Sequence, residues 1–388
     1  MVVALSAEPF VAPVSVRLWS ELEFAAGKSA WQGLLRRSTA NPLFMSWEWQ
    51  SRWWRLHGAA LRGQLVLLAA YAGDGTLVGL APLYRRDAAH RCGLRSARLE
   101  LIGAAFRGSA RVTFSEYLDF IVDKAWEEAV LAAFSARILE DRNWSDFVAA
   151  ATRTDGMVAR AVQAHGLGEC YLREQDVLTA YAVPLPARFE EYLKALKPGI
   201  RRKLWNRRSR LTTPVFRFAR ESEIEPLLRQ IAQFQAVRWG TLGDAQSRTQ
   251  FHVGFATAMA RQDALRMSVL LQNGEPISAM YNVELDGTEY NLQSGFSPGA
   301  APLSPSYLHF GYCLESAARR GVRSFDFLAG SGRSRSYKED FGAGEVRIAT
   351  LQVIRDPVLQ RLYRLYDGAP AWLRTLGRSL GRGSSQHA

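Results

Sequence analysis

The chain of 388 residues has few of the residues that build disulfide scaffolds and metal sites. Its three cysteines, Cys92, Cys170 and Cys313, are far apart in the sequence. This spacing excludes a disulfide framework and favours a reducing compartment. The six histidines include no pair spaced four residues apart, a spacing that would place two imidazoles on one helix face. We therefore expect neither a structural disulfide nor a metal ion.

Long apolar runs and targeting signals are also missing. The longest uncharged stretch, residues 290–314, is interrupted by three prolines and several glycines, so it cannot form a membrane-spanning helix of about 20 residues. Residues 1–16 lack a basic start and contain one acidic residue and two prolines, which is untypical of a signal peptide. We expect a cytoplasmic protein, with peripheral association at the inner face of the membrane as an alternative.

Positive charge is present, but it is concentrated in two segments. The net charge is +12, and residues 197–210 contribute seven basic residues with no acidic one. Residues 355–388 contribute six arginines against two aspartates, which leaves only +1 for the other 340 residues. A protein that binds nucleic acid over its whole surface would distribute its charge more widely.

The order of predicted elements occurs twice along the chain. In the first half, strands at 65–72 and 77–86 form a hairpin, followed by a strand at 116–122, a helix at 124–142 and a strand at 144–150. The second half repeats this order with a hairpin at 264–285, a strand at 288–296, a helix at 306–320 and a strand at 322–329. The length also suits two domains. The pattern predicts an α/β (α+β) protein with two similar units, each a mixed central sheet flanked by helices.

A helical region separates the two units, with helices expected at 188–196, 199–211, 221–239 and 245–261. Pro184 and Pro186 mark the boundary. We expect an N-terminal domain over residues 1–175 and a C-terminal domain over residues 176–356. The second domain would include the basic helical segment 197–211, and a basic amphipathic tail would cover residues 357–388.

The segment 290–341 has the order of an anion-binding site. A strand ending in Gln293, Ser294, Gly295 and Phe296 is followed by a loop of small residues and a helix that begins near Tyr307. Free backbone N–H groups and the helix dipole at such a junction attract phosphate groups. Ordinary helix capping explains the same pattern.

Tyr337 and Lys338 follow the strand at 322–329, at the strand end where α/β sheets usually hold ligands. The lysine could stabilise negative charge on a reacting carbonyl oxygen. Alternatively, it is a solvated lysine beside a structural tyrosine.

These segments together resemble GNAT-superfamily acyltransferases of the CelD/BcsL type, which are similar to the FemABX peptidyltransferases. The resemblance rests on NPLFMSWEWQSRWWRLHG (41–58), GLAPLYRR (79–86), EYLDFIV (116–122), IRRKLWNRRSRL (200–211) and most of residues 277–342. The G-x-x-x-FDFL strand and the closing Y-K-x-x-F stand in the expected order. The loop lacks the usual Q/R-x-x-G-x-G/A pattern of GNAT enzymes.

The resemblance implies tandem GNAT-like domains, with acyl transfer in the C-terminal domain and acceptor binding in the N-terminal one. It places Tyr337 and Lys338 near the transferring carbonyl, and Tyr117 with Asp119 near the acceptor. The donor's phosphates would face the helix start at Ser304 and Ser306. By extension we assign Ser294, Gly295, Phe296, Arg201 and Arg202 to the donor, and Glu116, Trp47 and Gln293 to the acceptor. Candidates for the general base are Asp119, Glu116, Glu284 and Asp326.

The two basic segments have alternative interpretations. Residues 197–210 could bind CoA, a nucleotide sugar, a tRNA acceptor stem or an anionic membrane, or could pair with acidic residues nearby. In the tail, residues 358–380 could lie on a membrane, although docking on the protein is the commoner fate of such helices. The tryptophans at 47, 49, 53 and 54 fall on more than one helix face, so at least one would be exposed or line a cleft; we favour the interpretation that they belong to the core.

We conclude that the sequence predicts an acyltransferase. It would move an acyl group, in the first instance acetyl, from acyl-CoA to an amine or hydroxyl of a small-molecule or glycan-precursor acceptor. One alternative is an aminoacyl-tRNA-dependent, Fem-like aminoacyltransferase. Another is a non-catalytic scaffold in a polysaccharide-synthesis complex.

Overall fold

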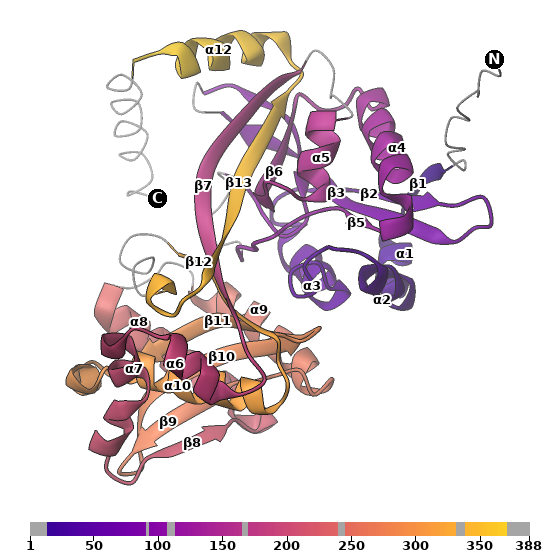
Figure 1. The fold of residues 1–388 in the computed structure, drawn as a ribbon. Helices are drawn as coiled ribbons and strands as arrows, with labels where there is room; N and C mark the ends of the chain where they lie inside the picture. The colour runs from indigo at the N-terminus through magenta and orange to yellow at the C-terminus, as the bar shows by residue number, and fades with distance from the viewer. Residues whose placement is uncertain are drawn as a thin grey trace, which may run out of the picture.

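The computed structural model describes residues 14–90, 93–106, 113–164, 170–239, 245–330 and 338–370. Two lobes are joined by one continuous mixed sheet (Figure 1). The first lobe contains β1 (Ser15–Trp19), α1 (Glu21–Ala26), α2 (Lys28–Arg37), α3 (Trp47–His57), β2 (Gln64–Tyr71), β3 (Leu77–Ala89), β4 (Arg95–Leu101), β5 (Ile121–Val122), η1 (Lys124–Trp126), α4 (Glu127–Glu140), β6 (Asp146–Arg153) and α5 (Met157–Ala164). The predicted mixed α/β fold with helices flanking the sheet is confirmed.

The second lobe begins after the long strand β7 (Tyr171–Pro184). It contains α6 (Phe189–Ala195), α7 (Pro198–Leu204), η2 (Asn206–Arg210), β8 (Val215–Phe218), η3 (Glu221–Glu223), α8 (Ile224–Trp239), α9 (Ala245–Ala260), β9 (Ser268–Gln272), β10 (Glu275–Leu285), β11 (Thr288–Phe296), η4 (Pro298–Leu303), α10 (Pro305–Arg319) and β12 (Ser324–Gly330). The chain then returns through β13 (Gly344–Ile354) and continues into α12 (Pro357–Gly368). Of the predicted helix 199–211, only the first half is an α-helix.

The sheet has an internal pseudo-twofold order. Its strands run β1-β2-β3-β4-β6-β13-β7-β12-β11-β10-β9-β8. Counted outward from the central β13–β7 pair, the strands of the first lobe (β6, β4, β3, β2, β1) and of the second (β12, β11, β10, β9, β8) follow each other in the same order. Each lobe has one parallel pair, β4–β6 in the first and β11–β12 in the second. The repeated element order found in the sequence therefore corresponds to a repeated structure.

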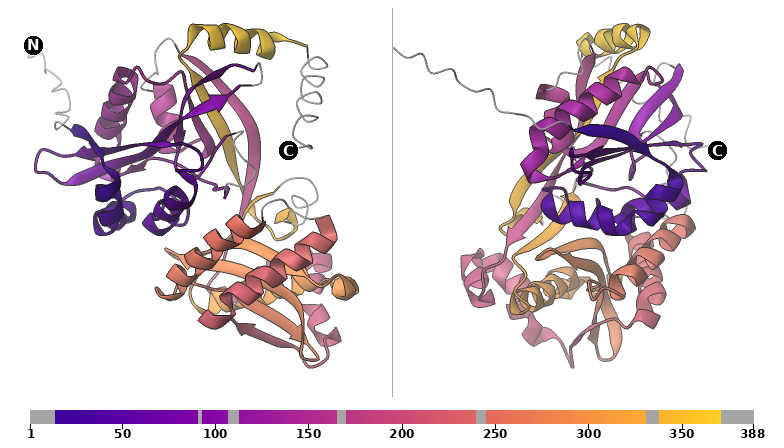
Figure 2. Two further views of the ribbon diagram at one scale, coloured as in Figure 1. Left: turned by 180° about the vertical axis from the view of Figure 1, so that it is seen from behind. Right: turned by 90° about the vertical axis from the view of Figure 1, so that its right-hand side faces the viewer.

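Strands are exchanged between the lobes at the centre of the sheet. β7 follows the first lobe in the chain but pairs with β12 of the second, while β13 follows the second lobe but pairs with β6 of the first. β7 and β13 also pair with each other, from Gly344 opposite Ala182 to Ile354 opposite Tyr171. Figure 2 shows these two strands running side by side from one lobe to the other. The second lobe thus pairs with the strand that directly follows the first lobe in the sequence, and the first lobe pairs with the strand that directly follows the second.

The hairpin turns of the second lobe form where the sequence predicts them. Asn273 and Gly274 have φ of 52° and 82°, and Asp286 and Gly287 have φ of 48° and 71°. Two successive residues with positive φ match the right-handed twist of the flanking strands, and Asn-Gly and Asp-Gly tolerate this conformation best.

The predicted strand 116–122 is wrong over most of its length. Only Ile121–Val122 pairs with β3, and Tyr117 adopts a left-handed φ of 54°. The polar side chains of this segment bind other elements instead of continuing a ladder: Asp119 accepts hydrogen bonds from the start of α5, and Tyr117 reaches Asp326 of the second lobe.

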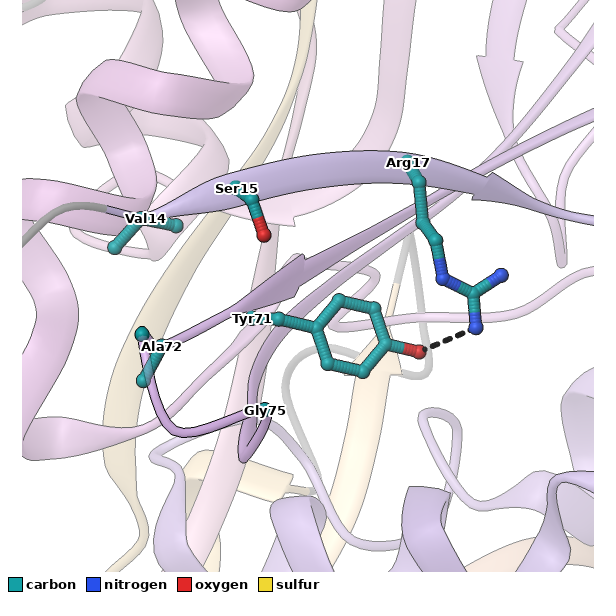
Figure 3. A pocket seen from close by; sticks show the side chains of 7 residues that line it. Val14, Ser15, Arg17, Tyr71, Ala72 and Gly75 are labelled. Atoms are coloured by element: carbon teal, nitrogen blue, oxygen red, sulfur yellow. Dashed lines mark hydrogen bonds between the residues drawn. The ribbon is translucent and has the colours of Figure 1, made fainter.

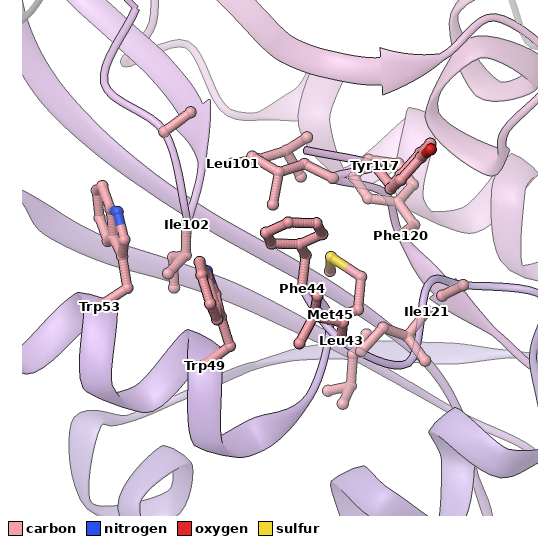
Figure 4. Close-up of a cluster of buried hydrophobic side chains, with 14 of the residues drawn as sticks. Leu43, Phe44, Met45, Trp49, Trp53, Leu101, Ile102, Tyr117, Phe120 and Ile121 are labelled. Carbon is pink, nitrogen blue, oxygen red and sulfur yellow. The ribbon is translucent and has the colours of Figure 1, made fainter. Parts of the chain in front are cut away.

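The largest hydrophobic core continues from the first lobe into the second. Trp49 and Trp53 are fully buried on α3, among the side chains of Figure 4. The ring of Trp49 lies 4.7 Å from that of Phe251 and 4.8 Å from that of Phe255, both on α9. Aromatic packing therefore fixes the lobes against each other.

Helix α12 packs on the far end of the first lobe, where Leu359 and Tyr363 are buried against Ile354 and Tyr171. Among the helices that the structure describes, none is long and apolar enough to cross a membrane.

Candidate active site between the lobes

The two parallel strands of the second lobe separate after three residue pairs. β11 and β12 pair from Thr288–Ser324 to Tyr290–Asp326 and then diverge. Both strands become irregular directly beyond that point: the register between β11 and β10 skips Leu292, and one extra residue of β12 lies between Asp326 and Ala329 opposite β7. Bulges of this kind free backbone groups from the ladder and are common beside active sites.

The bulge of β12 is strained and is held in place by Lys338. Leu328 has a φ of 59°, which is costly for a residue with a branched side chain. The buried ammonium of Lys338 donates to the carbonyl oxygens of Phe327, Leu328 and Ala329 at 2.6, 2.9 and 2.8 Å. These three bonds use every N–H of the ammonium group. The lysine therefore orders the strand. This arrangement leaves no N–H of the ammonium group for the direct contact with a substrate carbonyl that the sequence led us to expect.

Two carboxylates bind the N–H groups of the same bulge. Asp326 accepts from the backbone of Leu328 at 2.6 Å, and Glu116 of the first lobe accepts from Ala329 at 2.7 Å. The hydroxyl of Tyr117 donates to Asp326 at 3.1 Å. Residues from both lobes thus meet at the point where β11 and β12 separate.

Burial shifts the pKa values of these groups toward neutrality. Loss of solvent raises the pKa of Asp326 to about 6, although the Leu328 N–H and Tyr117 oppose the shift. Burial also raises the pKa of Glu116, against the Ala329 N–H and the charge of Lys338. For Lys338, burial lowers the pKa and the two carboxylates oppose this. Groups that titrate near neutral pH are suited to proton transfer.

Beyond the divergence, β11 leads through η4 to the start of α10. Ser304, the first residue before the helix, has a left-handed φ of 59°, and no described side chain caps the helix. Ser306 lies half-buried in the first turn. The N-terminus of this 15-residue helix therefore offers positive potential without a capping carboxylate.

The basic segment lies against this helix start. Arg207 donates a hydrogen bond to the hydroxyl of Ser304, and the ammonium of Lys203 lies 5.1 Å from the ring centre of Tyr307. Arg208 instead pairs with Glu315 at 2.7 Å and stacks on Trp205. The sequence pointed to Arg201 and Arg202 as phosphate ligands, whereas the residues that touch the helix start are Lys203 and Arg207.

The end of β11 is packed against α8. A Cβ at Gly295 would lie 2.9 Å from the Cβ of Phe234 and 3.0 Å from the carbonyl oxygen of Ile231, so only glycine fits without movement. The carbonyl of Ser294 accepts from Gln235 at 2.9 Å. Gln293 and Phe296 are half-buried on the same strand. The structure therefore places this predicted set beside the divergence.

Two predicted acceptor residues have structural partners of their own. The carboxylate of Asp119 accepts from the backbone N–H groups of Phe120, Met157 and Val158 at 2.9, 2.9 and 2.7 Å. Burial raises its pKa to about 6. Trp47 donates its indole N–H to the carbonyl of Phe24 at 2.9 Å. Asp119 thus holds the start of α5, and Trp47 is not part of the cluster around Glu116.

Tyr337 lies outside the described residues. Asp326 and Leu328 complete the cluster, and sequence reasoning missed Leu328 because nothing in FDFLAG signals a left-handed residue. The Y-K-x-x-F spacing has a physical basis: Phe341, three residues after Lys338, stacks on Phe327 with ring centres 4.9 Å apart.

The parallel strand pair of the first lobe carries buried ion pairs. β4 and β6 pair over three residues, and there Arg98 binds Asp146 and Arg86 binds Glu100, each at 2.9 Å and nearly without solvent exposure.

A hollow of about 480 Å³ lies far from this cluster, at the edge formed by β1 and the β2–β3 turn (Figure 3). It is lined by Val14, Ser15, Arg17, Tyr71, Ala72, Gly73 and Gly75. Within the described ranges, no three His, Cys, Asp or Glu side chains are grouped closely enough to hold a metal ion.

Comparisons with solved structures place this arrangement in a known fold. FemX aligns with a TM-score of 0.61 and 11% identity over 90% of this chain and 99% of its own. A conserved protein of unknown function from Bacteroides thetaiotaomicron gives 0.54 and 10%, covering 88% and 100%. The C-terminal domain of a protein assigned as a lysylphosphatidylglycerol synthetase from Agrobacterium fabrum gives 0.50 and 11%, covering 88% and 95%. At these identities the likeness concerns the fold.

No curated protein matches the chain. Residues 199–339 match the family model described as Acetyltransferase (GNAT) domain. This range contains α8 to β12, the divergent strands and Lys338. These residues of the second lobe therefore match a GNAT acetyltransferase domain, and the expectation of an acyltransferase enzyme is confirmed.

Proposed function

We propose that the protein is an acyltransferase of the CelD/BcsL type. It transfers an acyl group, in the first instance acetyl, from acyl-CoA to an amine or hydroxyl of a sugar-type or amino-containing acceptor in polysaccharide or envelope biosynthesis. The second lobe binds the donor, and the first lobe forms the acceptor side. The match to a GNAT domain supports acyl-CoA as the donor.

The observation that carries the proposal is the separation of β11 and β12 beyond Tyr290 and Asp326. An acyl-pantetheine arm placed between these strands would meet backbone N–H groups of β11 near the skipped Leu292, which can stabilise the oxyanion. The phosphates would then reach the start of α10 beside Arg207 and Lys203.

The chemistry needs only one proton acceptor. A neutral amine attacks the thioester carbonyl, the C–N bond forms, the C–S bond breaks, and CoA leaves as a thiolate that takes up the proton lost by the nitrogen. Glu116 suits removal of the proton from the attacking ammonium, because burial raises its pKa and it lies half-buried beside the bulge. Lys338 acts through the β12 backbone, which it holds in place.

The donor assignment is tested by calorimetric titration with acetyl-CoA and with desulfo-CoA. We expect saturable binding that weakens about tenfold or more in Arg207→Leu, because a charged contact to phosphate contributes roughly 1.5–3 kcal/mol. Arg210→Leu, an exposed change in the same segment, is the matched control. Equal affinity of the wild type and Arg207→Leu would remove the donor site from this position.

Aminoacyl-tRNA is the alternative donor. It is supported by the sequence resemblance to Fem enzymes and by the fold likeness to FemX over both lobes. A parallel titration with deacylated tRNA distinguishes the two. Salt-sensitive binding of tRNA without binding of acetyl-CoA would favour this alternative, and no binding of either would favour a non-catalytic scaffold.

We also propose that the cytoplasmic protein associates peripherally with anionic membranes through α12. Val358 and Leu365 on this helix are 57% and 73% exposed, and residues 371–388 contribute three arginines and no acidic residue. Basic amphipathic helices bind anionic lipid surfaces. Co-sedimentation with phosphatidylglycerol vesicles, but not with phosphatidylcholine vesicles, is expected, and loss of this binding in Leu365→Asp would support the assignment to α12.

A further inference from the structure

Arg52 on α3 has an uncompensated charge at the boundary between the lobes. Its side chain is half-buried, and among the described residues its guanidinium has neither a hydrogen-bond acceptor nor an ion-pair partner. Burial and the neighbouring charge of Arg55 lower the pKa of Arg52. Even a half-buried guanidinium without an anion is unfavourable, so this group calls for a partner that the described residues do not supply.

A second polar group without a partner lies beside it. The hydroxyl of Tyr281 on β10 is completely buried and makes no hydrogen bond, although nearly all buried hydroxyl groups do so. The charge of Arg52 acts on this tyrosine and opposes the rise in its pKa that burial causes. The ring of Tyr281 lies 5.7 Å from that of His252 on α9, and the guanidinium of Arg52 contacts Gly254 of the same helix. Both unsatisfied groups therefore lie against one stretch of α9, and both can donate a hydrogen bond.

The second lobe is shaped to admit the guanidinium. A Cβ at Gly254 of α9 would lie 2.0 Å from one terminal nitrogen of Arg52 and 2.3 Å from its central carbon. Glycine at this position allows the arginine to rest directly on the helix backbone. The guanidinium is thus placed by residues of both lobes.

This pair lies beside the proposed transfer site. Tyr281 pairs across the sheet with Gln293, the residue directly after the skipped Leu292 of β11. Its ring belongs to the same core as Tyr290 and Tyr117, which places it on the sheet face that is turned toward the first lobe. That face carries Asp326 and Glu116 at the divergence of β11 and β12, whereas α7 and the buried side of α10 belong to another cluster.

We infer that Arg52 and Tyr281 bind an anionic group of the acceptor, a phosphate or a carboxylate. The inference rests on the proposed function only in that it identifies the bound molecule as the acceptor. The anion site itself does not depend on the identity of the donor. A planar guanidinium donates two parallel hydrogen bonds to such a group, and the tyrosine hydroxyl supplies a third. The acceptor is then an anionic molecule held by its charge while its amine or hydroxyl faces the bulge of β12.

The test titrates the full-length protein with inorganic phosphate and, separately, with acetate, at low ionic strength and in the presence of saturating desulfo-CoA. Desulfo-CoA occupies the donor's phosphate site, so the remaining binding reports on other sites. We expect binding of one probe to weaken about tenfold or more in Arg52→Leu and several-fold in Tyr281→Phe. Arg52→Lys, which keeps the charge and loses the fork, should bind with intermediate affinity. The probe that binds identifies the group as phosphate or carboxylate.

Arg55→Leu is the matched control, because Arg55 lies three residues further on the same helix, is exposed, and donates to the carbonyl of Ser51. Its affinity for the probe should fall far less than that of Arg52→Leu, because Arg55 contributes only the longer-range charge that also lowers the pKa of Arg52. Absence of binding of both probes to the wild type, or equal binding by the wild type and Arg52→Leu, would overturn the inference. Measuring acetyl-CoA affinity in both Arg52→Leu and Arg207→Leu separates the two sites. If Arg207→Leu binds acetyl-CoA as tightly as the wild type, the donor assignment fails, but the result for anion binding at Arg52 is unaffected.

Discussion

At the scale of single residues, charged side chains control the conformation of one short piece of backbone. Leu328 is held in a left-handed conformation by an ammonium on its carbonyl side and by Asp326 on its N–H. Glu116 binds the next N–H. The strain of such a residue persists only where its surroundings fix it, so the geometry of β12 depends on the ionisation of these three groups.

Lys338→Met should separate positioning from folding. Without the ammonium, the carbonyls of Phe327, Leu328 and Ala329 lose their common donor, and the bulge relaxes. We expect kcat to fall at least about 100-fold with little change in acetyl-CoA affinity, measured by thiol release and by calorimetry. Lys194→Met, at an exposed position of α6, is the control. Wild-type turnover in Lys338→Met would contradict the role.

The rate should depend on pH in a bell-shaped manner. Burial raises the pKa of Glu116 and lowers that of Lys338. Activity therefore rises as Glu116 loses its proton, above the usual carboxylate range, and falls as Lys338 loses its proton, below the usual lysine range. Because the two groups interact, the limbs belong to the pair. Glu116→Gln should abolish the rising limb, and an unchanged profile of kcat/KM in this variant would exclude Glu116 as the base.

At the scale of elements, the position of α7 against α10 sets the charge at the proposed donor site. A Cβ at Gly311 of α10 would lie 2.2 Å from the carbonyl oxygen of Leu204 of α7. The two helices therefore touch through backbone atoms. This close contact brings Lys203 and Arg207, at the end of α7 and in η2, to the first turn of α10.

Gly311→Ala should force the two helices apart. Overpacking of this kind costs about 1–3 kcal/mol of folding free energy, and it moves Arg207 away from Ser304. We expect a lower urea midpoint together with weaker binding of acetyl-CoA. Gly199→Ala is the control, because a Cβ there meets nothing within 4 Å. Destabilisation without any loss of CoA affinity would show that α7 does not contribute to the donor site.

The elements that the sequence could predict are those defined by local signals. The turns at Asn273-Gly274 and Asp286-Gly287, the helix at 306–320 and the basic segment all follow from residue type and spacing. Asp119 and Glu116 could not be distinguished, because both belong to one acidic-aromatic stretch and only the tertiary structure places α5 over the first. The prediction of a strand at 116–122 was wrong for the same reason: its alternating hydrophobic residues belong to a non-strand segment packed between the lobes.

At the scale of the whole molecule, the exchanged strands make the lobes a single structural unit. Sequence reasoning expected two units side by side, because β7 and β13 have the composition of ordinary strands and nothing local indicates their partners. Leu351 illustrates the arrangement: it is buried on β13 and pairs with Ala149 of β6 and with Glu174 of β7. A change in packing at Leu351 therefore affects both β6 and β7.

Leu351→Ala should therefore destabilise both lobes together. A cavity at this buried position costs about 2–5 kcal/mol. We expect one unfolding transition at a lower temperature, and faster hydrogen exchange in β6 of the first lobe and in β12 of the second. Leu68→Ala, a buried change on β2, should raise local exchange in the first lobe only. Two resolved transitions in the Leu351 variant would contradict the coupling.

The strand exchange also orders events during synthesis of the chain. β7 is made before the second lobe that uses it, so that lobe can close its sheet once β12 has left the ribosome. β13 is made after both lobes yet borders β6, so the first lobe waits, with one side of β6 uncovered, until residue 354 is available. The half of the protein that is translated first is thus the half that is completed last.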